Sequence, residues 1–212
     1  MHIVVADELS PSALAVLRNQ GWTVDAASGR AFAQLARDLA AADALIVRSA
    51  TRVTAELLAA AGQLRVIARA GAGVDNIDLA AAEARGVPVL NAPGATTNSV
   101  AELALALMLA QARLVPAADR SMKAGRWEKK AFAGSELAGK TLGLIGYGRI
   151  GRVVARLAGA FGMTVVAHDP AVSADDAAAH GVRLVALDDV FAAADYLSLH
   201  VPSSAATRQL VD

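Results

Sequence analysis

The chain has 212 residues, and its 20 basic and 20 acidic side chains give a formal net charge of zero. That length fits one large domain or two small ones, with room for at least one substantial core. Zero net charge gives no long-range attraction to phosphate backbones or anionic lipids, so no nucleic-acid or membrane partner is expected. A hydrophobic content of 55% with 19% charged residues excludes a disordered chain.

The sequence contains no cysteine, which excludes disulfide scaffolds, thiolate metal sites and cysteine nucleophiles. No metal site of another kind is expected. Residues 1–7 have neither a basic segment nor a long apolar one, so no signal peptide is expected. The most apolar stretch, residues 100–110, is too short and too polar to cross a bilayer. We therefore expect a soluble globular protein of the cytoplasm.

Short apolar strands alternate with helix-forming segments in the first part of the chain. Strands are predicted at residues 2–6, 22–25, 44–47, 64–68 and 87–90. Helices are predicted after Ser10-Pro11 and at residues 31–39, 54–61 and 78–85, several of them bounded by a glycine. Continuous apolar strands separated by helices predict a parallel sheet covered on both faces. The expected fold of residues 1–95 is α/β and flavodoxin-like.

The pattern changes after Asn91-Ala92-Pro93-Gly94. Ser99 and Glu102 have the spacing of a capping box and predict the start of a long apolar helix, with a second helix at 115–124. The alternation then restarts. Strands are predicted at 141–145, 164–168, 183–185 and 196–200, and helices at 149–160, 174–180 and 187–193. We expect a second domain over residues 96–212.

Residues 146–151 form the pattern G-x-G-x-x-G between a predicted strand and a predicted helix. In such a loop Gly146 would allow the tight turn, Gly148 the close approach of a pyrophosphate, and Gly151 the packing of the helix on the strand. Free N–H groups near Arg149 and Ile150, at the helix start, would bind the pyrophosphate. The alternative interpretation is a purely structural glycine turn.

Asp169 ends the second strand of this domain, 18 residues after Gly151. A carboxylate at that place can accept hydrogen bonds from the hydroxyls of an adenosine ribose, and it repels a 2′-phosphate. The pattern therefore predicts a Rossmann domain that binds NAD in preference to NADP.

Six segments carry a resemblance to a known family. They are residues 45–51, 69–78, 91–94, 99–103, 139–151 and 199–202. With them the chain resembles the D-isomer-specific 2-hydroxyacid dehydrogenase family from its first strand to its last residue. The resemblance implies a substrate domain at residues 1–95 and an NAD-binding domain at residues 96–212.

The same resemblance implies the reaction, which is NAD-dependent oxidation of a D-2-hydroxy acid by hydride transfer. The substrate expected first is 3-phospho-D-glycerate, oxidised to 3-phosphohydroxypyruvate in serine biosynthesis. Glycerate, glyoxylate or lactate derivatives and formate are the alternatives within the family.

The resemblance also assigns roles to single residues. Arg48 and Ser49 would face the carboxylate or phosphate of the substrate, and the backbone N–H groups of Gly71, Ala72 and Gly73 would bind the carboxylate. Ala72 would also lie near the nicotinamide. Thr96 stands where some relatives carry an Asn beside the substrate. The cofactor would be bound by Gly146, Gly148, Arg149, Ile150, Gly151, Asp169, His200, Val201 and Pro202.

Several of these residues have simpler interpretations. Without the resemblance, Arg48 fits a surface residue at a strand end equally well, and residues 71–73 fit an ordinary turn. His168 and His200 lie at strand ends and are interpreted as structural or cofactor-lining. Arg65 and Arg69 flank an apolar strand and fit solvated side chains.

The proton-transfer chemistry of the family needs an Arg, a His and a Glu that lie beyond Asp212 in relatives. We therefore expect no catalytic residue within this chain, a Rossmann sheet limited to strands 3-2-1-4, and a truncated protein without turnover of its own. A non-catalytic NAD(H)-binding sensor or scaffold is the alternative function. A receiver domain is set aside because Arg48, and no Asp, follows the third strand. The apolar helices between residues 99 and 124 predict a homodimer or homotetramer.

Overall fold

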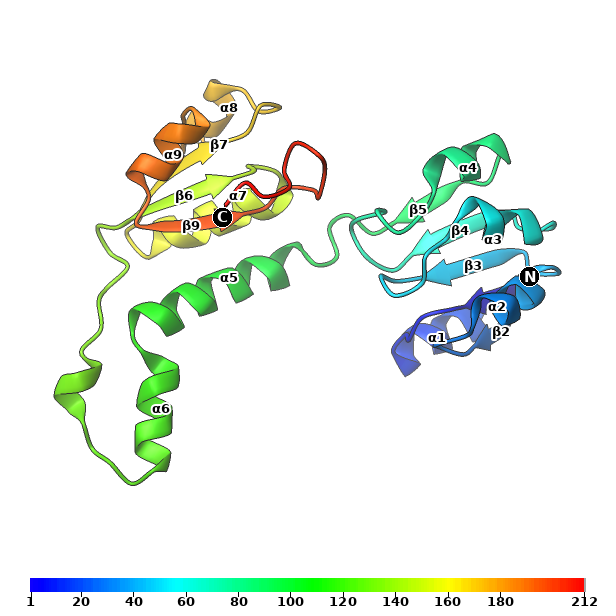
Figure 1. Ribbon diagram of the computed structural model, residues 1–212, viewed down its shortest axis with the longest axis horizontal. Coiled ribbons are helices and arrows are strands. Elements are labelled where there is room, and N and C mark those ends of the chain that lie inside the picture. The colour runs from blue at the N-terminus through cyan, green and yellow to red at the C-terminus, as the bar shows by residue number, and fades with distance from the viewer. Residues whose placement is uncertain (212) are drawn as a thin grey trace. The chain divides into compact units, whose positions relative to one another are not determined.

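The computed structural model describes residues 1–211 (Figure 1). The chain divides into two compact units, Met1–Ala95 and a second unit that begins at Thr96. The domain boundary predicted from the sequence lies at the same position. Each unit has its own parallel sheet and its own core.

The first unit contains a five-stranded parallel sheet in the order β2-β1-β3-β4-β5. The strands are β1 (His2–Val5), β2 (Thr23–Ala26), β3 (Ala44–Val47), β4 (Val66–Arg69) and β5 (Val89–Asn91). This order is that of flavodoxin-like folds, which confirms the expected fold. β5 begins two residues later than predicted, because the Val87 N–H bonds to the Ala82 carbonyl and Pro88 has no N–H to donate.

Four helices connect these strands. They are α1 (Pro11–Arg18), α2 (Phe32–Leu39), α3 (Ala55–Ala60) and α4 (Leu79–Ala84). The side chains of Ser10, Thr54 and Asp78 cap α1, α3 and α4 by accepting hydrogen bonds from backbone N–H groups. A large core includes Leu39, Leu57 and Ile67, and a smaller apolar cluster includes Ile3 and Val5. Both clusters hold the strands rigidly, which fixes the loops at their carboxyl ends.

The second unit begins with α5 (Thr97–Ala112) and α6 (Val115–Lys123), followed by the short 3-10 helix η1 (Lys129–Phe132). The predicted capping box is wrong. The helix starts earlier, with Thr96 as N-cap, and the Ser99 hydroxyl inside the first turn donates to the Thr96 carbonyl at 3.0 Å. Within residues 1–211 no single helix meets the length and apolarity of a membrane span, and α5 and α6 meet them only as a pair bent by 63°.

The second sheet is parallel and four-stranded, in the order β8-β7-β6-β9. Its strands are β6 (Thr141–Ile145), β7 (Thr164–His168), β8 (Arg183–Leu184) and β9 (Tyr196–Leu199). Its helices are α7 (Arg149–Ala160), α8 (Ala174–Ala178) and α9 (Leu187–Ala193). Counted within the unit, this is the 3-2-1-4 order expected for a Rossmann sheet. Helices α5 and α7 pack against each other (Figure 1). Leu105 of α5 and Val154 of α7 belong to the buried core of the second unit.

Candidate functional site

A cavity of about 530 Å³ lies at the carboxyl ends of β6, β7 and β9. Its lining comes from the segments that follow these strands and from the stretch after β9. The lining residues are Ile145, Gly146, Gly148, His168, Asp169, Pro170, Ala171, Leu187, His200, Val201, Pro202, Ala206, Thr207 and Leu210. Ligands of doubly wound sheets bind at this edge, in mostly apolar cavities with a few polar groups. The cavity therefore lies where the sequence predicts the cofactor.

Three glycines shape the loop at one wall of this cavity, each for a different physical reason. Gly146 has φ +94°, and a Cβ there would lie 2.5 Å from the His200 carbonyl oxygen. A Cβ on Gly151 would collide with the Gly146 carbonyl, which keeps the first turn of α7 close to the end of β6. A Cβ on Gly148 would have no protein atom within 4 Å. The first and last glycines thus serve internal packing, whereas Gly148 leaves space open toward the cavity.

The N-terminus of α7 offers unpaired donors beside that open space. Gly148 is the N-cap residue and no side chain caps the helix. Within residues 1–211, no hydrogen bond uses the backbone N–H of Arg149 or Ile150. Neither residue is among those that line the cavity, so their predicted part in cofactor binding rests on these N–H groups alone. Such groups at the positive end of a twelve-residue helix are suited to bind a pyrophosphate.

Asp169 connects the glycine loop to the end of β7. One oxygen of its carboxylate accepts from the Tyr147 N–H at 2.8 Å, and the other accepts from the Ala171 N–H at 2.9 Å. Each carboxylate oxygen can accept a second hydrogen bond, so the group can still receive ribose hydroxyls. Asp169 therefore positions the loop and presents a negative charge to the cavity.

Two histidines, His168 and His200, line the cavity, and neither forms an ion pair with another of residues 1–211. The His200 Nε2 and the Ser198 hydroxyl are 2.9 Å apart, and burial lowers the pKa of His200 below its ordinary value. The imidazole of His200 is therefore neutral at neutral pH. The Nδ1 atom of His168 lies 3.2 Å from the Val185 carbonyl oxygen, which ties the end of β7 to the segment after β8. These positions agree with their interpretation as structural or cavity-lining residues.

The expected substrate residues of the first unit follow β3 and β4. Arg48 and Ser49 are exposed directly after β3, and residues 71–73 follow β4. No hydrogen bond within the described chain uses the N–H groups of Ser49, Ala50, Ala72 or Gly73. The carboxyl edge of the sheet thus presents two loops with free donors, a composition suited to anions. Thr96 belongs to the second unit, where it is the exposed N-cap of α5.

The roles of three polar residues beside these loops were not predicted from the sequence. Asp7 is buried at the end of β1, and Asn76 bonds to the backbone of the loop after β3. The interpretation of Arg69 as a solvated side chain is wrong. Its side chain is only 11% exposed, and its Nε donates to the Asn76 side-chain oxygen at 2.9 Å. The one sequence signal for such a buried, loop-binding side chain is a polar residue directly after a short apolar strand, the position of Asp7 after β1.

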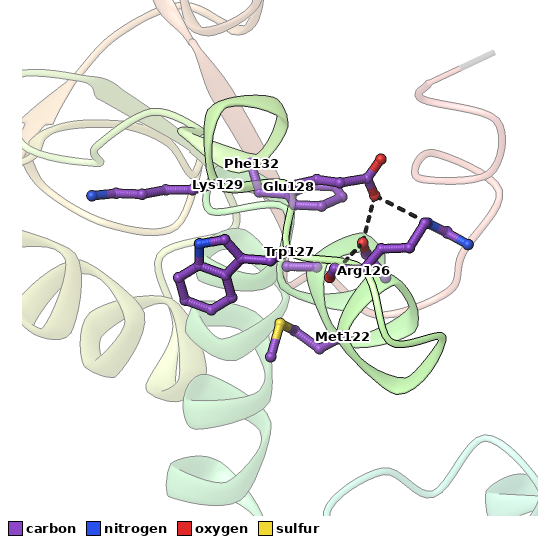
Figure 2. A pocket seen from close by; sticks show the side chains of 8 residues that line it. Met122, Arg126, Trp127, Glu128, Lys129 and Phe132 are labelled. Carbon is purple, nitrogen blue, oxygen red and sulfur yellow. Dashed lines mark hydrogen bonds and ion pairs between the residues drawn. The ribbon is translucent and has the colours of Figure 1, made fainter.

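A second hollow, of about 190 Å³, lies beneath residues 126–132 (Figure 2). The Ser121 hydroxyl donates to the Glu128 carboxylate, and the Arg126 Nε lies 3.3 Å from the same carboxylate oxygen. These two bonds lower the pKa of Glu128. The hollow is too small for a dinucleotide, and its central polar groups satisfy one another. We therefore interpret this hollow as part of the local packing of the segment between α6 and β6, and not as a cofactor site.

Comparison with known proteins agrees with this geometry. Residues 105–212 match the profile of the family described as D-isomer specific 2-hydroxyacid dehydrogenase, NAD binding domain. D-3-phosphoglycerate dehydrogenase of Mycobacterium tuberculosis is 49% identical over 210 residues, which are 99% of this chain and 40% of that protein. Hydroxypyruvate reductase of Thermotoga maritima is 53% identical over 170 residues, 80% of this chain and 55% of that protein. The crystal structure of the TT0316 protein from Thermus thermophilus has a TM-score of 0.90 and 37% identity, covering 99% of this chain and 68% of that one.

The chain spans about 40% of the length of the D-3-phosphoglycerate dehydrogenases that it matches. The profile match includes every residue of the cavity at the glycine loop. The cofactor expected from the loop and from Asp169 is thereby confirmed as NAD. The chain belongs to the D-isomer specific 2-hydroxyacid dehydrogenase family, and its second unit is the NAD-binding domain of that family.

Proposed function

We propose that this chain supplies the substrate- and NAD-binding parts of an NAD-dependent D-2-hydroxyacid dehydrogenase that oxidises 3-phospho-D-glycerate to 3-phosphohydroxypyruvate. The observation that carries the proposal is the space left open at Gly148, bordered by free N–H groups and by the Asp169 carboxylate. The identity of 49% to a D-3-phosphoglycerate dehydrogenase supports the choice of substrate. By its chemistry the reaction belongs to the first step of serine biosynthesis.

When bound, NAD supplies the acceptor for the hydride that leaves C2 of the hydroxy acid. The residues of this chain bind and orient. The N–H groups of Arg149 and Ile150 hold the pyrophosphate, and Asp169 accepts from the ribose hydroxyls and repels a 2′-phosphate. The neutral His200 lines the cavity without adding a positive charge that would favour the phosphorylated cofactor.

The first unit supports a substrate with two anionic groups. The loop after β3 offers the N–H groups of Ser49 and Ala50 together with the Arg48 guanidinium, and the loop after β4 offers those of Ala72 and Gly73. Two separate sets of donors match a carboxylate and a phosphate on one molecule. Lactate, glycerate and glyoxylate carry only one anionic group, so they would leave one set of donors unused.

Calorimetric titration of the folded chain tests the proposal. We expect heat of binding when NADH is added. We also expect 3-phospho-D-glycerate to bind, with lactate and glycerate as only weak competitors for its site. If lactate or glycerate binds as tightly as the phosphorylated acid, the assignment of the substrate is wrong. If NADH releases no heat and leaves the unfolding midpoint unchanged, the cofactor assignment is wrong.

We further propose that the chain associates with a second copy of itself through the second unit. Large apolar side chains stand exposed on α5 and in the segment after α6, with Leu103 59%, Leu107 63% and Trp127 78% exposed. A monomer seldom exposes such a series of apolar groups. Sedimentation should give a dimer or larger assembly for the wild type and a smaller species for Leu103→Glu/Leu107→Glu. The exposed Val16→Glu in the first unit is the matched control, and equal behaviour of both variants would contradict this interface.

A further inference from the structure

The loop after β3 is held on one side by a buried carboxylate. Asp7 follows β1 and is only 7% exposed. Its Oδ2 accepts from the Arg48 N–H at 2.5 Å and from the Thr51 N–H at 3.3 Å, and its Oδ1 accepts from the Thr51 hydroxyl at 2.6 Å. The two ends of this four-residue loop are therefore fixed through their donors.

Asn76 holds the acceptors of the same two residues. Its side-chain NH₂ donates to the Arg48 carbonyl at 2.8 Å and to the Thr51 carbonyl at 2.6 Å. Its own backbone carbonyl accepts from the Val53 N–H at 2.9 Å, so Asn76 is itself anchored. Asp7 and Asn76 together bind every backbone polar group of Arg48 and Thr51.

Arg69 extends this network to the loop after β4. Its Nε donates to the Asn76 Oδ1 at 2.9 Å. One of its terminal nitrogens lies 2.7 Å from the place that a Cβ on Gly71 would occupy, so the guanidinium packs against the Gly71–Gly73 loop. The loop after β3 is thus joined by hydrogen bonds through Asn76 to Arg69, whose guanidinium packs against the loop after β4.

We propose that Asp7 and Asn76 are positioning residues that hold both anion-binding loops in the geometry required by the substrate. The inference rests on the proposed function, because it takes the anion to be that of the hydroxy acid. The residues at the loop ends are satisfied within the protein, and the central N–H groups of Ser49 and Ala50 remain free in the described part of the chain. Donors held in place before binding lose less freedom when an anion arrives, which raises affinity.

The variant Asp7→Asn separates positioning from simple electrostatics, because the two predict changes of opposite sign in the affinity for the anion. Removal of a negative charge near the loop would by itself tighten the binding of an anion. The amide oxygen of asparagine can face the two backbone N–H groups only when its NH₂ faces the Thr51 hydroxyl, and its bonds lack the charge of the carboxylate, so the loop is held less tightly. We expect the dissociation constant for 3-phospho-D-glycerate to rise about tenfold in Asp7→Asn and in Asn76→Ala.

Asp43→Asn is the matched control. The Asp43 carboxylate also accepts from a backbone N–H, that of His2 at 2.7 Å, but it precedes β3 and lies at the opposite end of the sheet. The control variant keeps an oxygen that can accept from the His2 N–H, and it should keep the affinity of the wild type for 3-phospho-D-glycerate. In Asp7→Asn and Asn76→Ala the NADH affinity should change much less than the affinity for 3-phospho-D-glycerate, because the cavity at the glycine loop belongs to the second unit and Ala72 alone of the first unit is expected near the nicotinamide.

Hydrogen exchange in the free protein tests the network without any substrate. The N–H groups of Arg48 and Thr51 bond to Asp7 and not to Asn76, so faster exchange of both in Asn76→Ala reports release of the loop. If the wild type binds no 3-phospho-D-glycerate while this exchange is faster, the proposed substrate is wrong and the positioning role stands. Exchange rates equal to those of the wild type, or tighter anion binding in Asp7→Asn, would overturn the positioning role.

Discussion

Replacing Gly148 with alanine tests whether the open space in the glycine loop is reserved for a ligand. The residue has φ −77°, which alanine adopts without strain, and an added Cβ would meet no protein atom within 4 Å. Because Gly148 is the N-cap of α7, where alanine is less favourable than glycine, the free energy of unfolding should change by no more than about 1 kcal/mol. The folded protein thus accommodates the methyl group.

The bound cofactor should not accommodate it. A methyl group forced into a closely packed contact costs about 1–3 kcal/mol. That range corresponds to a loss of roughly 5- to 150-fold in NADH affinity, at about 1.4 kcal/mol for each factor of ten. The structure therefore predicts a variant of nearly normal stability and strongly reduced cofactor binding.

The assay is a calorimetric NADH titration of each variant, paired with urea unfolding of the same samples. Gly159→Ala is the control, because Gly159 lies in the same helix, has no atom within 4 Å of an added Cβ and is not part of the cavity lining. It should gain about 0.5–1 kcal/mol of stability and bind NADH as the wild type does. Wild-type NADH affinity in Gly148→Ala would refute the reasoning.

Three further predictions concern stability. Gly146→Ala should lower the free energy of unfolding by about 2–5 kcal/mol, since φ +94° and the nearby His200 carbonyl both oppose a side chain; an unchanged urea midpoint would contradict this. The folded state keeps His200 neutral at a pH just below 6.5, where the unfolded chain takes up a proton, so stability should fall as the pH drops through that range. His200→Gln should flatten this dependence in urea titrations, and an equal slope would exclude His200 as its source. Thr54→Ala should remove the cap of α3 and lower the free energy of unfolding by about 1 kcal/mol, measured by urea unfolding.

The strands and the glycine loop were predictable because both depend on local patterns. Parallel strands such as β3 and β6 are short apolar runs, and the three glycines stand between a strand and a helix. The position of Asp169 after β7 follows from the same register. Its contact with the Tyr147 N–H does not, because that bond depends on how two strands meet in space.

The network around Asp7 was not predictable for the same reason. Asp7 and Thr51 are 44 residues apart, and the bonds between them exist only because β1 and β3 are neighbours in the sheet. Arg69 fits a solvated side chain when its strand is considered alone, since its partner Asn76 lies across a loop. The capping-box prediction at Ser99 failed because the helix continues through Ser99, Asn98 and Thr97, almost one full turn, to its N-cap at Thr96.

The preference between the two nicotinamide cofactors tests the central claim most directly. A carboxylate about 4 Å from a 2′-phosphate opposes it by roughly 1–4 kcal/mol, so the wild type should bind NADH at least about fivefold more tightly than NADPH. Asp169→Asn removes the charge and keeps one side-chain oxygen as acceptor, while its NH₂ faces one of the two backbone N–H groups. Because both cofactors lose that contact alike, the ratio of the two dissociation constants should move toward one. A wild type that binds neither cofactor, or a ratio that is the same in Asp169→Asn, would contradict the account.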